Sequence, residues 1–215
     1  MVFNEIYKSI QKINSNKPII IAICGNQGAG KTIFSNKFEK YLRNKKINVF
    51  NLASEAYFIY DRDERKAFLE KFTKEKKLLE WPKISYKRNE TLLLKHLKMI
   101  KSGKNISEHC LYNTSTGKKD HTLKITLDKH RKNLVLLVGT FILDRKFRKF
   151  LDITIFINTP TKTRFERIFK RAKKRKRPKK YQITKKILKI TDDYLEDYFN
   201  KNKIDFNFYV ASRGV

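Results

Sequence analysis

The feature that most constrains this chain is a glycine-rich segment, GNQGAGKT, which directly follows an unbroken apolar run at Ile19–Cys24. The pattern G-x-x-x-x-G-K-T, placed after a predicted buried strand and before a predicted helix, is the context of a phosphate-binding P-loop. Its glycines permit positive φ, so that backbone amides can turn toward phosphate oxygens. The segment therefore predicts a strand–loop–helix unit that binds a nucleoside triphosphate.

Each part of this loop has an expected task. Lys31 is predicted to reach the β- and γ-phosphates, and the Thr32 hydroxyl to bind Mg²⁺ that stays with the nucleotide. The helix that begins near Gly30 adds its N-terminal dipole. The expected cofactors are ATP, or another nucleoside triphosphate, and Mg²⁺. The residues expected to bind them are Gly25, Asn26, Gln27, Gly28, Ala29, Gly30, Lys31 and Thr32.

The order of apolar segments predicts the fold class. Continuous apolar runs are typical of strands buried on both faces of a parallel sheet, and amphipathic helices are predicted between them. This alternation indicates an α/β protein with a three-layer P-loop NTPase fold and a parallel five-stranded sheet. Strands are expected at 19–24, 47–53, 133–139, 153–158 and 205–210, and helices at 3–14, 92–100, 161–173 and 184–199.

Length and composition limit the organisation of the chain. Its 215 residues contain no Pro/Gly/Ser-rich linker and no internal repeat, so we expect one domain over 1–215. No apolar run approaches the roughly 20 residues that span a bilayer, which predicts a cytoplasmic protein without membrane contact. Cys24 and Cys110 are the only cysteines and are expected to be reduced thiols. The sequence does not predict an oligomeric state.

The formal net charge is +30, from 51 Lys and Arg against 21 Asp and Glu. Such a charge attracts polyanions without specificity, so non-specific nucleic acid is a possible partner. The alternative is a compositional bias, because the lysines are spread over every predicted helix. Both interpretations stay open.

A carboxylate is expected near the loop, because ligands of open α/β sheets gather beyond the carboxyl ends of the strands. Glu55 follows the second predicted strand in the stretch NLASEAYF. There it would accept the proton of an acceptor hydroxyl and help to hold Mg²⁺. A solvated loop residue is the alternative.

Several motifs together resemble the uridine kinase family of P-loop nucleoside kinases, over about 19–197. IAICGNQGAGKT is similar to the first strand and loop of that family, and ASEAYF to its S-x-D-x-F-Y segment. LEWP resembles its F-D-x-P segment, GKNISEHCLYN its G-K-x-I-x-x-P-x-Y-[DN] stretch, and VLLVGTFIL its V-L-I-x-E-G-x-F-x-L strand.

The resemblance implies roles for individual residues between about 55 and 132, the expected acceptor-binding region. Glu55 takes the position of the catalytic Asp, and Glu80 that of an Asp that binds ribose hydroxyls. Tyr112 stands where an aromatic residue contacts the base. Tyr57 belongs to an aromatic pair near the acceptor. The implied substrate is a nucleoside or another small alcohol.

The sequence departs from the family at Val138, which falls where the third strand carries an acid that helps to coordinate Mg²⁺. If this correspondence holds, one carboxylate of the metal shell is missing. A non-catalytic nucleotide-binding protein, or a nucleic-acid-binding P-loop protein, therefore remains an alternative to an active kinase.

A basic block, KRAKKRKRPKK at 170–180, has nine basic residues in eleven. The family carries an arginine-bearing lid after the fourth strand, which implies a lid at about 164–181. Planar guanidiniums suit the charge on the equatorial oxygens of a transferring phosphoryl group. A solvated face and nucleic-acid contact are the alternatives. The expected lid arginines are Arg164 toward the substrate, Arg167 and Arg171 in catalysis, and Arg175 on the nucleotide.

These inferences combine into one expectation. The chain is predicted to transfer the γ-phosphate of ATP to a small-molecule alcohol, with the 5′-hydroxyl of uridine or cytidine as the expected acceptor. Lys31, Glu55, Arg167 and Arg171 are the expected catalytic residues, and Thr32 and Glu55 the expected metal ligands.

Overall fold

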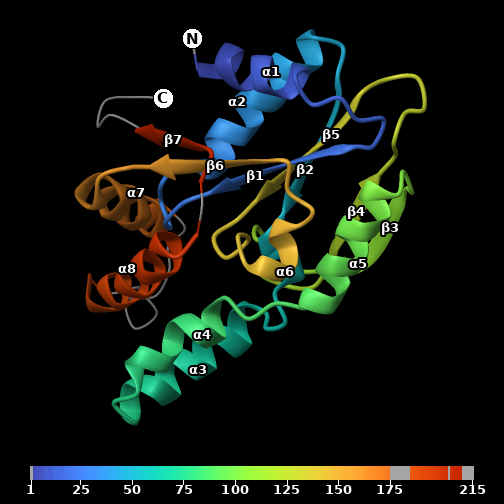
Figure 1. Ribbon diagram of the computed structural model, residues 1–215. Helices are drawn as coiled ribbons and strands as arrows, with labels where there is room; N and C mark the ends of the chain where they lie inside the picture. The colour runs from blue at the N-terminus through green and yellow to red at the C-terminus, as the bar shows by residue number, and fades with distance from the viewer. Residues whose placement is uncertain (1, 175–184, 203, 210–215) are drawn as a thin grey trace.

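The computed structural model describes residues 2–174, 185–202 and 204–209, along which strands and helices alternate (Figure 1). In chain order the elements are α1 (Val2–Gln11), β1 (Ile19–Cys24), α2 (Lys31–Asn44), β2 (Asn48–Ala53), the 3₁₀ helix η1 (Ser54–Tyr57), α3 (Arg62–Lys74), the 3₁₀ helix η2 (Leu78–Glu80), α4 (Trp81–Ser85), α5 (Glu90–Lys101), β3 (Ile106–Leu111), β4 (His121–Ile125), β5 (Asn133–Val138), α6 (Arg145–Arg148), β6 (Ile153–Asn158), α7 (Thr161–Lys174), α8 (Lys185–Asn200) and β7 (Phe206–Tyr209).

The main sheet confirms the predicted fold class. Its five strands are parallel and follow the order β2-β5-β1-β6-β7. The strand before the glycine-rich loop, β1, is therefore the central strand. Val138 at the end of β5 pairs with Ile23 of β1 on one side and with Ala53 of β2 on the other. The loop after β1 and the 3₁₀ helix after β2 consequently start at the same edge of the sheet.

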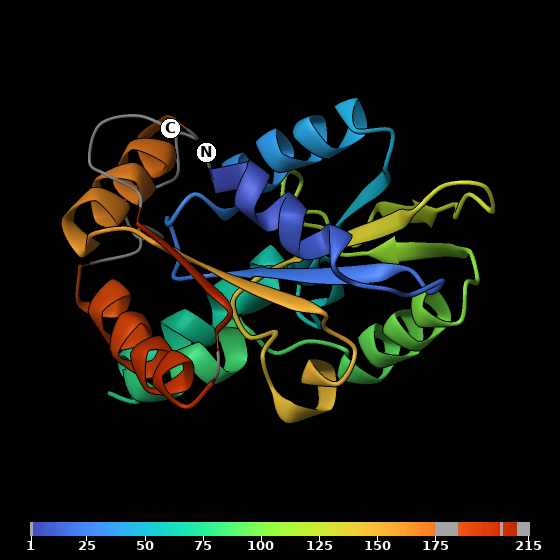
Figure 2. The ribbon, with the colours of Figure 1, turned by 45° about the horizontal axis from the view of Figure 1, so that its top comes forward.

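Helices cover both faces of this sheet, which gives three layers (Figure 2). Alternate residues of the strands serve the two faces: Ile19, Ile21 and Ile23 pack with α1 and α2, while Ile20 and Ala22 pack with α5 and α8. Every residue of β1 is buried, as expected for a strand covered on both sides. The continuous apolar runs of the sequence reflect this double burial.

The region between β2 and β5 contains elements that the sequence analysis did not predict. Only its helix at 92–100 was expected, and it is present as α5. An antiparallel hairpin of β3 and β4 follows, and α3 and α4 precede. Helix α3 has no buried residue, so its sequence lacks the apolar periodicity of a packed helix. Asp61 and Glu64 form a capping box at its N-terminus, which is the local signal that it begins there.

The predictions for the first helix, the last strand and the cysteines need small corrections to their bounds or none. The predicted helix at 3–14 is α1, which ends at Gln11, and the fifth strand is present as β7. Cys24 is buried, Cys110 is exposed, and neither forms a disulfide. Among the residues that the structure describes, no helix combines the length and the apolar character that crossing a bilayer requires.

The close packing of η1 against the end of β5 yields a stability prediction. A Cβ added at Gly139 would lie 2.7 Å from Cβ of Ser54 and would also overlap the Ser54 hydroxyl. Gly139→Ala should therefore destabilise the protein by about 1–3 kcal/mol through overpacking. Urea unfolding measures the change.

The matched variant is Gly139→Ala combined with Ser54→Gly, which removes the two Ser54 atoms that the new methyl group would meet and leaves only Cγ2 of Ile142, at 3.1 Å. It should be more stable than the sum of the two single changes predicts, because the clash is a pairwise effect. Simple additivity of the two free-energy changes would contradict the proposed contact.

Candidate functional site

The glycine-rich loop between β1 and α2 takes the conformation that its sequence predicts. Gly25, Gly28 and Gly30 have φ of 146°, 81° and 101°. A Cβ on Gly25 would lie 2.6 Å from the carbonyl oxygen of Ile157, and one on Gly28 would lie 2.8 Å from that of Arg164. The loop is thus pressed against the end of β6 and the start of α7, where side chains have no room.

The side chain of Lys31 curls back over this loop. Its Nζ donates hydrogen bonds to the carbonyl oxygens of Gly25, at 2.9 Å, and Asn26, at 3.1 Å. Burial lowers the pKa of Lys31, while the charge of Glu55 acts in the opposite direction. A phosphate bound in the loop would add negative charge beside the ammonium and would oppose the effect of burial by raising the pKa of Lys31. The lysine is therefore held at the loop before any anion arrives.

Arg164 ties the loop to two helices. It is buried in α7, and all three of its side-chain nitrogens donate hydrogen bonds. The two Nη atoms form a bidentate pair with the carboxylate of Asp192 in α8, at 2.8 and 2.6 Å. One of them also lies 3.3 Å from the carbonyl oxygen of Gln27. In this structure Arg164 holds the loop in place and has no nitrogen left for a substrate.

Two further arginines of α7 were expected at the phosphate site. Nη1 of Arg167 is 3.5 Å from the carbonyl oxygen of Ala29, and it is the side chain nearest to Gly30. Arg171 donates from Nε to the carbonyl oxygen of Arg167, at 3.4 Å, and its charge contributes to lowering the pKa of Lys31. Arg167 and Arg171 therefore stand with Lys31 around the loop. Arg175 lies outside the described residues, and the predicted lid at 164–181 is described only as far as Lys174.

Glu55 lies at the same edge of the sheet. It is half-buried in η1, and its charge acts on Lys31, Tyr86 and Arg88. Thr32 is exposed in the first turn of α2. Val138, which ends β5, is 6% exposed and packs in the apolar cluster below the loop. The sheet thus brings Lys31 and Glu55 together, and it places an apolar side chain where the resemblance implied an acid.

Tyr57 lies in the core rather than on an open surface. Its hydroxyl is 2.7 Å from Nδ1 of His96, whose Nε2 is 3.2 Å from the carboxylate of Glu108. Tyr57 and His96 are 2% and 1% exposed. This chain of three side chains joins η1 to α5 and β3.

The two other expected acceptor residues are separated from each other. Tyr112 is 5% exposed, and its hydroxyl accepts a hydrogen bond from Arg65. The Arg65 guanidinium lies 4.6 Å from the ring centre of Tyr112 and 4.8 Å from that of Phe58. Glu80 is exposed and forms an ion pair with Lys83 at 3.1 Å. The structure therefore places Tyr112 beside η1 and Glu80 on the surface of η2.

Sequence reasoning missed three residues near this edge: Arg65, Arg88 and His96. Each is a polar side chain on a helical or loop segment, and its sequence neighbours give no motif. Arg88 is 7% exposed and His96 1%, so burial is what distinguishes them from the many surface residues of the same types. The isolated bridge between Phe58 and Arg88, with the flanking hydrogen bonds of the backbone, joins the segment of Arg88 to the end of η1.

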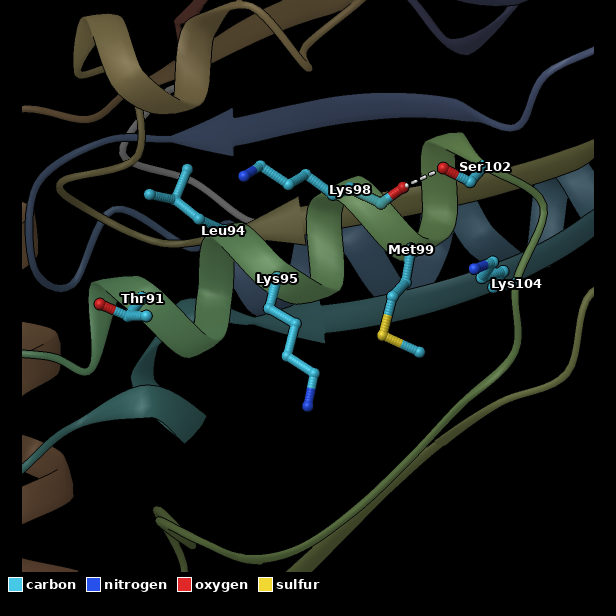
Figure 3. Close-up of a pocket in the computed structure, with 7 residues that line it drawn as sticks. All are labelled: Thr91, Leu94, Lys95, Lys98, Met99, Ser102 and Lys104. Atoms are coloured by element: carbon cyan, nitrogen blue, oxygen red, sulfur yellow. Dashed lines mark hydrogen bonds between the residues drawn. The ribbon is translucent and has the colours of Figure 1, made fainter.

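A hollow on α5 lies apart from this site (Figure 3). Lys95 and Lys98 point away from the helix, and Leu94 and Met99 supply its apolar part. None of the loop residues and neither Glu55 nor Arg167 lines it. It is not a part of the phosphate site.

Comparison with known proteins agrees with this geometry. The family model described as the phosphoribulokinase / uridine kinase family matches residues 20–210. A uridine kinase from Shewanella sp. (strain ANA-3) is 28% identical over 155 residues, which are 69% of this chain and 66% of that protein. The match thus spans slightly less than two thirds of the length of that relative.

Solved structures share the fold at low sequence identity. The phosphoribulokinase from Rhodobacter spheroides has a TM-score of 0.63 at 14% identity, over 93% of this chain and 74% of that one. The D-glycerate 3-kinase from Cryptococcus neoformans var. grubii has a TM-score of 0.61 at 10% identity, over 98% of this chain and 93% of that one. These likenesses show a P-loop kinase fold.

The ion pair of Arg164 and Asp192 gives the prediction for this site. Their side chains are 4% and 15% exposed. Asp192→Asn keeps the shape of the acceptor side chain but leaves the buried guanidinium without a counter-charge, which should cost ~3 kcal/mol. Urea unfolding should show this loss, and nucleotide affinity should fall because the loop loses its anchor.

Asp193→Asn is the matched control, since Asp193 is the exposed neighbour on the same helix. It should change stability by less than about 0.5 kcal/mol. Equal effects of the two substitutions would show that the pair does not hold the loop.

Proposed function

The chain belongs to the phosphoribulokinase / uridine kinase family, and on this premise we propose that it transfers the γ-phosphate of ATP to the 5′-hydroxyl of uridine or cytidine. The coarser part of the proposal is a phosphotransferase with a small alcohol as acceptor. The finer part, the nucleoside, rests on the uridine kinases that match the chain at 28% identity.

One observation carries the proposal: Lys31 and Glu55, which are 24 positions apart in the sequence, act on each other electrostatically at the edge where the phosphate loop begins. Phosphoryl transfer needs the phosphates neutralised and the acceptor hydroxyl oriented, with little further chemistry from the protein. Lys31, Arg167 and Arg171 supply positive charge on one side. Glu55 supplies a base that can take the proton of the hydroxyl.

The residues present fit a nucleotide-bound Mg²⁺. This ion is usually held by one or two protein groups together with substrate phosphates and water. The Thr32 hydroxyl and the Glu55 carboxylate are the proposed protein ligands, and the ion would neutralise charge between the β- and γ-phosphates. Over the described residues no group of three or more His, Cys, Asp and Glu side chains could hold a metal without the nucleotide.

The proposed acceptor contacts require movement. For Tyr112 to stack on a base, the Arg65 guanidinium must leave its ring face, and for Glu80 to bind a ribose it must leave Lys83. Tyr57 would act through the position of η1, because its hydroxyl is engaged with His96. Arg164 would reach a substrate only if it released Asp192.

A second candidate function is supported by Val138, whose apolar side chain ends β5 beside η1. A nucleotide-binding protein without turnover would use the same loop and need no acid there. The charge of +30 gives this candidate an acidic partner such as nucleic acid, bound without sequence preference.

The test compares the wild-type protein with Glu55→Gln in ATP consumption with Mg²⁺, using uridine, cytidine, pantothenate and no acceptor. Stimulation by uridine or cytidine is expected. Glu55→Gln should lower kcat by ~10²–10⁴-fold while leaving ATP affinity within a few fold, because a lost base affects the chemical step. Glu70→Gln, an exposed residue of α3, is the matched control and should behave as wild type.

Whether an acceptor stimulates ATP consumption decides between the catalytic and the non-catalytic candidate. If ATP binds with Mg²⁺ but no acceptor stimulates its consumption, the catalytic proposal fails and the non-catalytic candidate stands. If turnover is unchanged in Glu55→Gln, Glu55 is not the base. If no acceptor stimulates ATP consumption, Val138→Glu tests whether a carboxylate at that position creates activity.

A further inference from the structure

A groove of about 520 Å³ lies between α4, α8 and the segment that joins β5 to α6. Helices α4 and α8 contact each other directly, and Figure 1 shows α6 above α4 and to the right of α8. Aromatic side chains form the walls of the groove. The ring centre of Phe141 lies 5.0 Å from that of Tyr86, 5.6 Å from that of Tyr194 and 4.8 Å from that of Tyr198, all in edge-on arrangements. A volume of this size is typical of small-molecule sites, which combine apolar walls with few polar groups.

The groove is lined by one buried arginine, Arg88, whose guanidinium lies 5.9 Å from the ring centre of Phe147 but has a nitrogen without a hydrogen-bond partner in the described part of the chain. Arg88 is 7% exposed, and its Nη1 is buried with no hydrogen-bond partner among the described residues. A buried, unsatisfied donor on a charged group is costly and rare in folded proteins. Arg88 is thus a group for which a hydrogen-bond acceptor is missing.

The nearby carboxylates do not fill this role, because other side chains engage them. Glu90 forms an ion pair with Lys146. Asp144 interacts with Lys146 and with the hydroxyl of Tyr198 as well as with Arg88, and burial raises the pKa of its carboxyl group. Burial lowers the pKa of Arg88 despite the opposing charges of Glu55, Asp144 and Glu90. The neighbours therefore do not compensate the guanidinium for its burial.

The rim of the groove carries charges of both signs. Lys83, Lys87 and Lys201 lie on it, together with Asp197. Lys83 is paired with Glu80, and Lys87 lies over the ring of Tyr60 at 5.8 Å. With Arg88, Glu90 and Asp144 included, four cationic side chains and three carboxylates line the groove, which is a small positive excess that favours the entry of an anion.

From these contacts we propose that the groove is a binding site for a small aromatic carboxylate or phosphate ester, whose anionic group accepts hydrogen bonds from Arg88 and whose ring packs against the adjoining rings of Phe141 and Tyr194. A planar guanidinium matches such oxygens better than any other side chain. The site is separate from the phosphate loop, because none of residues 25–32 lines it. The groove nevertheless lies close to Glu55, because the charge of Glu55 acts on two residues that line it, Tyr86 and Arg88.

The test measures binding of benzoate and of phenyl phosphate by isothermal titration calorimetry, with benzamide as the uncharged counterpart of benzoate. Saturating non-hydrolysable ATP analogue and Mg²⁺ keep the phenyl phosphate out of the phosphate loop. The wild-type protein should bind at least one of the two anions and should bind benzamide more weakly. Arg88→Lys should weaken anion binding about tenfold or more, because it removes the two-pronged hydrogen bond to the oxygens.

Two further variants make the result decisive. Arg148→Lys is the matched control, since Nη1 of Arg148 is also buried without a partner but Arg148 does not line the groove. It should leave anion binding unchanged. Tyr194→Glu alters an exposed wall residue and should weaken both anions more than benzamide through like-charge repulsion.

No saturable binding of either anion by the wild-type protein would overturn the proposal. So would binding that is equal in wild type, Arg88→Lys and Tyr194→Glu. If Arg88→Lys does not fold, Tyr194→Glu alone decides, because Tyr194 is 40% exposed and its replacement leaves the core intact. None of these outcomes depends on whether uridine or cytidine is phosphorylated.

Discussion

The ion pair between Arg164 and Asp192 connects the parts of this molecule that must act together. It joins α7 to α8 by two hydrogen bonds, and the same guanidinium reaches the carbonyl oxygen of Gln27 in the phosphate loop. The glycines of the loop have no side chains to pack, and Gly25 and Gly28 lie directly against backbone carbonyl oxygens. The buried Arg164 therefore helps to fix the position of the loop, and the same helix places Arg167 beside Ala29 and carries Arg171 one turn further on. A glycine-rich loop loses much conformational freedom when it is ordered, so contacts with its surroundings have to hold it.

Much of the fold could be predicted from the sequence, because the information was local. The inner strands β1, β5 and β6 of the main sheet are nearly continuous apolar runs, which are typical of strands buried on both faces. The hairpin of β3 and β4 was missed because only the two end residues of β3 are buried, and the residues between them are mostly polar. Helix α3 was missed since it buries no residue, although its capping box at Asp61 and Glu64 could have revealed its start. Elements without a buried face leave little trace in hydrophobic periodicity.

The candidate site could be predicted only in part, for a related reason. Lys31 and Glu55 follow from spacing: one ends a fixed loop pattern, and the other follows a strand at the edge where ligands gather. Arg88 could not be found in this way, because what sets it apart is an absent hydrogen-bond partner in three dimensions. Tyr57 shows the converse case. An aromatic residue next to a proposed base suggests contact with the acceptor, yet its hydroxyl is turned to His96 in the core.

The placement of Glu55 depends on packing more than on charge. Its 3₁₀ helix is held on one side by Ser54 against Gly139, and on the other by Tyr57 through His96 and Glu108. Burial lowers the pKa of His96, which favours the neutral ring and a hydrogen bond with the tyrosine without a net charge in the core. A glutamate reaches about one methylene further than an aspartate, so the position of this short helix decides where the carboxylate ends. Ser54, Tyr57 and Gly139 set the backbone position of residue 55. They therefore decide where the carboxylate of Glu55 lies, although its side chain is longer than the aspartate of the family.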